Sequence, residues 1–196
     1  HIYDAISSGE YTSVMIDASH DPLEKNIERT KEIIALAHPK NISVEAELGV
    51  LSGIEDDLDI NEENALYTDP SDVEYFVKNT NCDSLAVAVG TSHGAYKFSG
   101  GKGLRFDLLE EIQTKLPKFP IVLHGASTID LEEVRRINNA GGGLQNNAKG
   151  ISEEEVKRAI AYGVCKLNIA TDLRLWWLSI YREFFRDNNG EWDQLK

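Results

Sequence analysis

The sequence is short of three things: basic residues, cysteines and long apolar runs. Its 20 Lys and Arg residues stand against 33 Asp and Glu residues, which gives a formal net charge of −13 at pH 7. Because nucleic-acid backbones are bound by basic surfaces, this balance argues against a nucleic-acid-binding protein. The apolar runs are too short for a membrane span, and the start of the chain lacks the pattern of a signal peptide, so we expect no membrane association.

Cysteine is represented by two residues, Cys82 and Cys165. Each lies near the start of an expected strand, which predicts a small buried thiol rather than a disulfide partner. Free thiols fit a reducing compartment, so we expect a cytoplasmic protein. The hydrophobic content of 41% is enough to bury a full core, which predicts a globular domain.

Short β-branched runs alternate with amphipathic stretches along the chain. The expected strands are 12–16, 42–47, 84–89, 121–123 and 166–169, and the expected helices include 22–37, 72–78, 106–116, 131–138 and 153–162. Asp69 before Pro70, and Ser152 before a run of glutamates, are good helix N-caps, and Ser19 is the expected cap of the helix near residue 22. This repetition is typical of an α/β fold with a parallel sheet and right-handed crossovers.

Polar residues gather where the expected strands end. They are Asp17, Ser19, Glu47, His93, His124, Ser127, Asn168 and Thr171. In a (β/α)₈ TIM barrel all strand ends open on one face, so such residues converge there, whereas an open sheet spreads them along an edge. We therefore predict a TIM barrel. Five expected strands are fewer than eight, so we expect residues 1–196 to form one partial barrel domain with roughly the last five βα units, lacking N-terminal strands.

Two of these residues, His93 and His124, each follow an expected strand and precede a glycine. Together with Asp17 and Glu47 they offer nitrogen and oxygen ligands that suit zinc or a similar divalent ion. Glu45 and Glu47 alternate onto one face of their strand, and two acids inside a barrel need a cation or polar partners. The pattern favours a metal site on the rim of the barrel.

Loops that lead into helices offer small residues and hydroxyls to a phosphate, because free N–H groups there attract anions. Lys97 adds a compact charge, and Arg174 has the geometry to hold a second phosphate through two hydrogen bonds. We expect Lys166 to start its strand, at the end of the barrel opposite the rim, and to have a structural role. This position argues against Lys166 as the amine of a Schiff-base aldolase. The loop residues are Gly94, Gly125, Ala126, Ser127, Asn168, Ile169, Ala170 and Thr171.

A long acidic segment begins at 52–57, after the strand that ends with Glu47. Most such segments are solvated loops. A glycine-hinged loop over a rim site also has the composition of a lid that carries an acid or a base.

Six segments of the chain support a more specific interpretation: 14–20 (VMIDASH), 44–49 (VEAELG), 67–70 (YTDP), 90–98 (GTSHGAYKF), 123–127 (LHGAS) and 166–172 (KLNIATD). In this order they resemble the class II, metal-dependent ketose-bisphosphate aldolases. The similarity is greatest to fructose-1,6-bisphosphate aldolases of the bacterial type, and it extends over nearly the whole chain.

The resemblance implies that His93 and His124 are catalytic zinc ligands. It implies a second metal site, for a divalent or monovalent cation, lined by Asp17 and Glu47. Glu55 corresponds to the mobile-loop acid that moves the proton of the enediolate. The positions that hold the dihydroxyacetone phosphate half are Gly94, Lys97, Gly125, Ser127, Asn168 and Thr171, and Arg174 corresponds to a position near the other phosphate.

The activity that the resemblance implies is reversible cleavage of fructose 1,6-bisphosphate to dihydroxyacetone phosphate and glyceraldehyde 3-phosphate, a step of glycolysis and gluconeogenesis. It runs through a zinc-stabilised enediolate without a Schiff base. The family also implies a homodimer or a larger homo-oligomer. Its general-base aspartate and its third zinc histidine fall before His1, so we expect this chain alone to be inactive. By the same resemblance, we expect the family's C-terminal helices to be missing from residues 1–196.

Ala170 departs from the fructose pattern. Fructose-bisphosphate enzymes commonly carry aspartate here and tagatose-bisphosphate enzymes commonly carry alanine. Because the two sugars differ only in configuration at C4, one carboxylate can alter the preference, and tagatose-1,6-bisphosphate aldolase is the second interpretation. Residues 171–174 and the glycine-rich insertion 141–150 are more similar to the fructose type.

Two interpretations from other classes stay open. A metal-dependent TIM-barrel hydrolase also uses rim histidines, but it has less need of Lys97 and of the 168–171 loop. A non-catalytic sugar-phosphate-binding module would bind the ligand without turnover.

Overall fold

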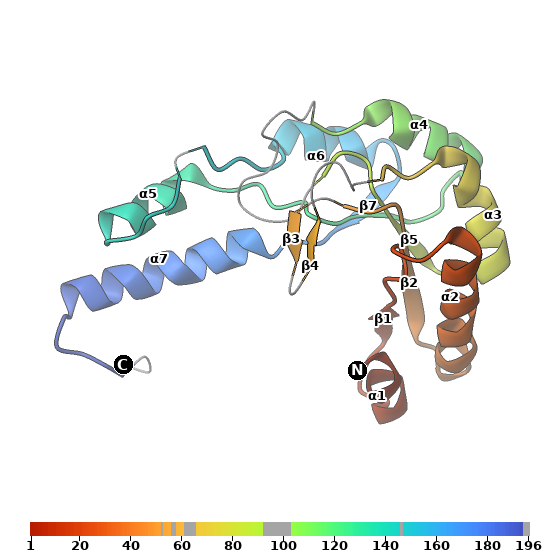
Figure 1. Cartoon of the computed structure of the whole chain (residues 1–196), viewed down its shortest axis with the longest axis horizontal. Helices are drawn as coiled ribbons and strands as arrows, with labels where there is room; N and C mark the ends of the chain where they lie inside the picture. Colours follow the sequence, from red (N-terminus) through yellow and green to blue (C-terminus); the bar gives the residue numbers. More distant parts are fainter. Residues whose placement is uncertain (52, 56–57, 61–65, 92–102, 146, 194–196) are drawn as a thin grey trace.

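The computed structural model describes residues 1–51, 66–91, 103–145 and 147–193, and the backbone of 53–55 and 58–60. Five parallel strands form one sheet in the order β1-β2-β5-β6-β7 (Figure 1). Their bounds are β1 (Ser13–Met15), β2 (Ser43–Leu48), β5 (Ser84–Val87), β6 (Ile121–Leu123) and β7 (Val164–Leu167). Each strand pairs with the next sheet strand along the chain, as the predicted α/β repeat requires.

Helices connect and cover these strands. They are α1 (Ile2–Ser8), α2 (Leu23–Ala37), the 3₁₀ turn η1 (His38–Lys40), α3 (Pro70–Thr80), α4 (Phe106–Lys115), α5 (Leu131–Asn139), α6 (Glu153–Ile160) and α7 (Thr171–Asp187). Among the helices that the structure describes, none has the length and apolar character that crossing a membrane requires.

The main core lies between the sheet and its helices, and α2, α3 and α4 lie side by side along one face (Figure 1). Alternation along each strand sends one set of apolar side chains toward these helices. The strand members of the core include Val44, Leu85, Val87, Ile121, Leu123 and Val164, and the helix members include Ile33, Phe76, Leu109 and Ile112. The other face of the sheet is left for the side chains that alternate with them, including Glu45 and Glu47. Lys166 also reaches this face, because the register shift in the β6–β7 pairing interrupts the alternation between Val164 and Lys166.

The sheet is curled, and this second face is the inner one. Glu45 on β2 and Lys166 on β7 are three strand spacings apart, roughly 14 Å in a flat sheet. Their side chains nevertheless meet, with Lys166 Nζ 2.6 Å from Glu45 Oε2. Side chains stand roughly perpendicular to a strand, so a contact across so many strands is the mark of a curved sheet. The sheet and helices therefore form part of a (β/α)₈ barrel, and the predicted fold class is confirmed.

Two of the predicted helix starts are confirmed. Asp69 accepts a hydrogen bond from Ser71 N at the start of α3. Ser152 and Glu155 form a reciprocal capping box at the start of α6. The predicted cap at Ser19 is wrong, because α2 begins after Pro22 and Ser19 donates its N–H and hydroxyl to Asp17 instead.

The last strand corrects two predictions. It begins at Val164, two residues before the predicted start, so Lys166 does not open it. Cys165 is exposed rather than buried, whereas Cys82 is buried as predicted. Cys165 is exposed because the pairing of β6 with β7 shifts register between Ile121 and Val122, at the level of Cys165. In addition, β7 is at the edge of the described sheet.

The acidic segment predicted as a loop contains regular structure. β3 (Gly53–Glu55) and β4 (Leu58–Ile60) pair as an antiparallel hairpin, in which Ile54 is opposite Asp59. This hairpin is separate from the main sheet. The glycine-rich connection predicted at 141–150 does lie between two helices, α5 and α6.

A second, smaller core holds α5 against α7. The two helices lie side by side at one end of the molecule, beyond the sheet (Figure 1). Arg136 on α5 binds Glu183 on α7, and Ser179 donates to the buried Glu133. The apolar members of this core include Ile129, Val134, Ile137, Ala148 and Leu175.

Candidate active site

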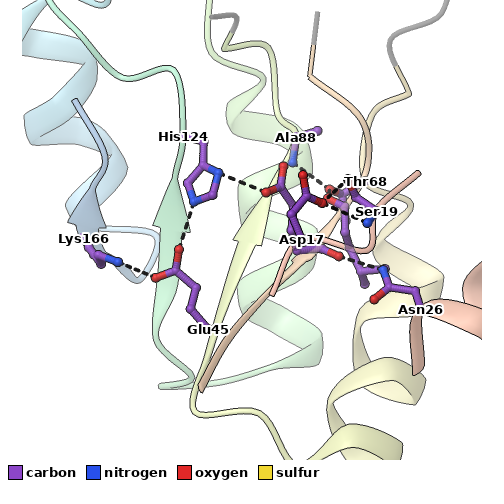
Figure 2. Close-up of polar contacts among 10 residues, drawn as sticks. Asp17, Ser19, Asn26, Glu45, Thr68, Ala88, His124 and Lys166 are labelled. Carbon is purple, nitrogen blue, oxygen red and sulfur yellow. Dashed lines mark hydrogen bonds and ion pairs between the residues drawn. The ribbon is translucent and has the colours of Figure 1, made fainter. Parts of the chain in front are cut away.

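A buried imidazole lies at the centre of the inner face. His124 directly follows β6, and its ring lies between two carboxylates of β2. Nε2 is 2.9 Å from Glu45 Oε1, and Nδ1 is 3.0 Å from Glu47 Oε2. Figure 2 shows the contact with Glu45 and the ion pair that continues from it to Lys166. The predicted placement of Glu45 and Glu47 on one strand face is confirmed, because both meet the same ring.

Lys166 completes this cluster from β7. Its Nζ lies 2.6 Å from Glu45 Oε2, so each oxygen of that carboxylate has a partner of its own. Glu45 is only 3% exposed. A buried carboxylate requires such partners, because burying it unpaired is costly. Lys166 therefore points toward the inner face, and its engagement with Glu45, rather than its place in the strand, argues against a Schiff-base amine.

The charges of the cluster shift its pKa values in opposite directions. Burial lowers the pKa of His124, but its hydrogen bonds with Glu45 and Glu47 and their charges outweigh burial and raise that pKa to about 10. Burial raises the pKa of Glu45, but the hydrogen bonds and charges of His124 and Lys166 outweigh it and leave the pKa below its ordinary value. Glu47, His124, Glu45 and Lys166 thus form a row in which carboxylates alternate with nitrogen groups.

Two buried polar side chains brace the carboxyl end of β2. Asn26 on α2 donates its Nδ2 to Glu47 O at 2.9 Å. Thr68 donates its hydroxyl to Leu48 O at 2.5 Å and accepts from Ala88 N at 2.8 Å, which ties the ends of β2 and β5 together. These bonds fix the backbone that carries Glu47 at the rim.

Asp17 follows β1 at the same edge. Met15 on β1 is paired with Glu45 on β2. Because the strands are parallel, Asp17 and Glu47, each two residues further along, lie beside each other. Asp17 is exposed, and its Oδ1 accepts from the N–H and the hydroxyl of Ser19 at 2.9 and 2.6 Å. Asp17 Oδ1 therefore has hydrogen-bond partners within its own turn, and the second carboxylate oxygen of Asp17 lies at the rim.

The donor set fits a zinc ion in part. His124 provides a buried ring nitrogen, and Glu47 places an oxygen beside it, which is the mixture of ligands that zinc takes. Within the part of the chain that the structure describes, no group of three or more His, Cys, Asp or Glu side chains is arranged to hold a metal. The other predicted zinc ligand, His93, lies outside the described residues, as do Gly94 and Lys97.

The loops after β6 and β7 are joined to each other. Ala126 N donates to Asn168 O, and Asn168 N donates to Leu123 O at 2.9 Å. The buried hydroxyl of Ser127 accepts from Ala170 N at 3.3 Å. The structure thus brings Ala126, Ser127, Asn168 and Ala170 together, as a shared phosphate-binding region requires.

Backbone geometry fixes the first of these loops. Gly125, with φ 57°, adopts the left-handed conformation that favours glycine. Gly150 packs so closely that a Cβ there would overlap Ser127 O and the Thr128 backbone. Asp172 on α7 accepts from Thr128 N at 2.9 Å and from Ile129 N at 2.8 Å.

The remaining predicted binding residues lie at the start of α7. Thr171 is the first residue of this helix. Arg174 lies one turn further and is exposed, as is Ile169 in the loop before it. The backbone of Glu55 lies in β3, and its side chain is outside the described residues.

Sequence reasoning gave no role in the site to four residues that hold it in place. Alternation could indicate that Glu45 faces inward, but it gave no sign that Lys166 reaches it from β7. Buried polar residues on a helix, such as Asn26, carry a weak signal, because their partners are backbone atoms of another element. The four residues are Asn26, Thr68, Lys166 and Asp172.

Comparison with known proteins gives a consistent result. Residues 1–196 match the family model described as "Fructose-bisphosphate aldolase class-II". The chain is 45% identical over 186 residues to the fructose-bisphosphate aldolase of Thermus caldophilus, and 42% identical over 192 residues to that of Helicobacter pylori strain J99. These matches cover 95% and 98% of this chain but 60% and 62% of the relatives, so the chain spans less than two thirds of their length.

A solved structure agrees with these relatives. The crystal structure of the YdjI aldolase from Escherichia coli K12 matches with a TM-score of 0.60 and 34% sequence identity. The match covers 86% of this chain and 47% of that one.

Proposed function

The chain belongs to the class II fructose-bisphosphate aldolase family, and on that premise we propose that the whole protein cleaves fructose 1,6-bisphosphate reversibly to dihydroxyacetone phosphate and glyceraldehyde 3-phosphate. The observation that carries the proposal is the place of His124. It is a buried imidazole at the carboxyl end of β6, beside Glu47 and next to two joined loops with small residues. Barrel enzymes build their active sites at this end of their strands.

Zinc is the metal of this proposal. His93 and His124 would hold the ion, and Asp17 and Glu47 would line a second cation site. When bound, zinc supplies a Lewis acid that polarises the ketose carbonyl. His124 contributes a ring nitrogen already fixed in position by two carboxylates.

The chain's own residues bind the sugar phosphate. Gly125 and Ser127 lie in the loop after β6, and Asn168 lies in the loop after β7, which leads into the N-terminus of α7. Helix N-termini attract phosphate groups. Gly94, Lys97, Ala126, Ile169, Ala170 and Thr171 belong to the same binding region, and Arg174 takes the second phosphate. Glu55, carried by the β3–β4 hairpin, moves the proton on the substrate carbon.

The proposal extends to assembly and location. The exposed apolar side chains on α7, among them Leu173, Trp176, Trp177 and Ile180, support a homodimer or a larger homo-oligomer, in which a second copy covers them. Both cysteines are free thiols, which fits the cytoplasm.

Tagatose 1,6-bisphosphate is the second candidate substrate, and one observation favours it. Ala170 stands next to Ser127, which accepts a hydrogen bond from its N–H, and its methyl group offers the C4 hydroxyl no carboxylate. The ratio of kcat/KM for the two epimers, measured on the full-length protein, decides between them. A clear preference for tagatose would reverse our order.

The experiment that tests the function is metal analysis with a coupled aldolase assay on the full-length protein, before and after chelation. We expect bound zinc, activity that is lost on chelation, and recovery with zinc or cobalt. Activity that ignores the chelator would contradict the metal assignment. Release of inorganic phosphate without carbon–carbon cleavage would indicate a barrel hydrolase, and tight binding of the bisphosphate without turnover would indicate a binding module.

A further inference from the structure

The Glu45–Lys166 pair is close to the proposed metal site but has no part in the proposed ligand set. Glu45 is buried, and its two oxygens contact different partners, His124 Nε2 at 2.9 Å and Lys166 Nζ at 2.6 Å. The pair spans 121 residues of sequence and joins β2 to β7 across the inner face (Figure 2). Its Lys166 side chain is half exposed, and an ion pair with such a partner adds little to stability, so a role beyond stability is worth seeking.

We propose that Glu45, anchored by Lys166, is a positioning residue that keeps the proton of His124 on Nε2 and so presents the lone pair of Nδ1 to the metal. This inference rests on the proposed function, since it assigns a role toward the zinc ion of that site.

The two ring nitrogens face different depths of the barrel. Glu45 is two residues before Glu47 in a strand whose carboxyl end forms the rim, so Nε2 faces the interior and Nδ1 faces the rim. The proposed ligands Asp17 and Glu47 lie at the rim end of their strands. Nδ1 is therefore the nitrogen on the metal side.

A histidine ligand needs its second nitrogen held by an acceptor, because this fixes the tautomer and the orientation of the ring. Glu45 Oε1 is such an acceptor for an N–H on Nε2. Lys166 occupies the other oxygen and so restrains the carboxylate from turning toward the rim, where it would become a ligand itself. One pair of residues thus orients His124 and keeps an additional carboxylate away from the metal.

The test uses full-length protein labelled with ¹⁵N-histidine, loaded with zinc alone, and the variants Glu45→Leu and Glu45→Gln. Leu fills a similar volume without an acceptor, and Gln keeps an acceptor oxygen. We expect the parent to show His124 with a protonated Nε2 and a metal-bound Nδ1, assigned by loss of the signal in His124→Gln. Zinc affinity, measured by competition with a chromophoric chelator, should fall about 10- to 100-fold in Glu45→Leu and much less in Glu45→Gln.

The matched control is Glu110→Gln, an exposed glutamate on α4 that loses the same charge far from the cluster in sequence. It should bind zinc like the parent. Lys166→Met adds an independent measurement, because a less restrained Glu45 should let the Nε2 proton of His124 exchange faster with water.

The outcomes distinguish the positioning role of Glu45 from the zinc site of the proposed function. Zinc bound through Nε2, or Glu45→Leu with unchanged affinity and tautomer, would overturn the positioning role and leave the zinc enzyme standing. A parent protein that binds no zinc would overturn both. If Glu45→Leu does not fold, an unchanged tautomer and exchange rate in Lys166→Met would overturn the role of the anchored pair.

Discussion

At the scale of single residues, the two cysteines occupy opposite environments. Cys82 is buried, and burial raises the pKa of its thiol to about 11, while Cys165 is exposed on the outermost strand of the sheet. The thiolate is the reactive form, and a pKa of about 11 leaves roughly one Cys82 in a thousand ionised at pH 8.

We therefore expect Cys82 to resist alkylation in the native protein. Iodoacetamide treatment at pH 8 followed by peptide mass mapping should find Cys82 unmodified, and modified only after unfolding in urea. Cys165 serves as the internal comparison and should react faster. Rapid native modification of Cys82 would show that the start of β5, at Ser84, opens readily.

Residues also show how far the sequence could predict the site. The alternation of Glu45 and Glu47 is a local property of an extended chain, so it could be predicted. Their meeting with His124 and Lys166 could not, because it depends on the curvature of the sheet. The exposure of Cys165 was missed for a related reason, since an irregular pairing in β7 leaves no signal in its own sequence.

At the scale of elements, α6 depends on its first turn. Ser152 and Glu155 exchange hydrogen bonds there, and Glu155 Oε1 also accepts from Leu104 N at 3.2 Å, which attaches the helix to the segment before α4. Ser152→Ala should lower the free energy of unfolding by about 1 kcal/mol, measured by urea denaturation. Ser152→Asp keeps a capping oxygen and should lose much less. Equal losses in the two variants would mean that the cap is not the cause.

The start of α7 makes a second prediction. Asp172 accepts from Thr128 N and Ile129 N, and so holds the loop that carries Ser127. Asp172→Ala should raise the KM for the sugar bisphosphate several-fold more than it lowers kcat, because the binding loop loses its fixed position while the reacting groups stay in place. Steady-state kinetics on the full-length protein measure both constants. Asp187→Ala, at the exposed end of the same helix, is the control and should leave KM unchanged.

Elements with strong local signals were predicted well. The strand β6 matches its predicted bounds, because a proline precedes its apolar run and the His-Gly pair ends it. The strand β7 was predicted two residues late, since its sequence mixes Cys165 and Lys166 with apolar residues. The hairpin β3–β4 was missed because its acidic composition is typical of a solvated loop.

At the scale of the whole molecule, α5 and α7 form a unit that charged side chains hold together. Arg136 binds both Glu133 on its own helix and Glu183 on α7, and Glu133 also accepts from Ser179. The hydrogen bonds that Arg136 donates to Glu183 and Glu133 raise its pKa above the ordinary value.

Arg136→Met should loosen this unit without unfolding the sheet. The variant leaves the buried Glu133 without its cation, so we expect faster hydrogen exchange at the amides of α5 and α7, while β2, β5 and β6 keep the protection of the parent. Exchange measured by mass spectrometry on the full-length protein tests this. Arg135→Met on the exposed side of α5 is the control. Loss of protection across the sheet would mean that the two cores unfold together.

The order of the strands also determines when, during synthesis of the chain, the contact between Glu45 and Lys166 can form. Each strand of the sheet pairs with the one made before it, so a nascent chain extends the sheet at a single edge as it leaves the ribosome. Lys166 emerges 121 residues after Glu45. During that interval Glu45 has no ammonium partner, and the inner face carries an excess of negative charge. A chain arrested before β7 thus presents a growing barrel wall whose acidic face is not yet neutralised, and translation of β7 supplies the ammonium group that neutralises it.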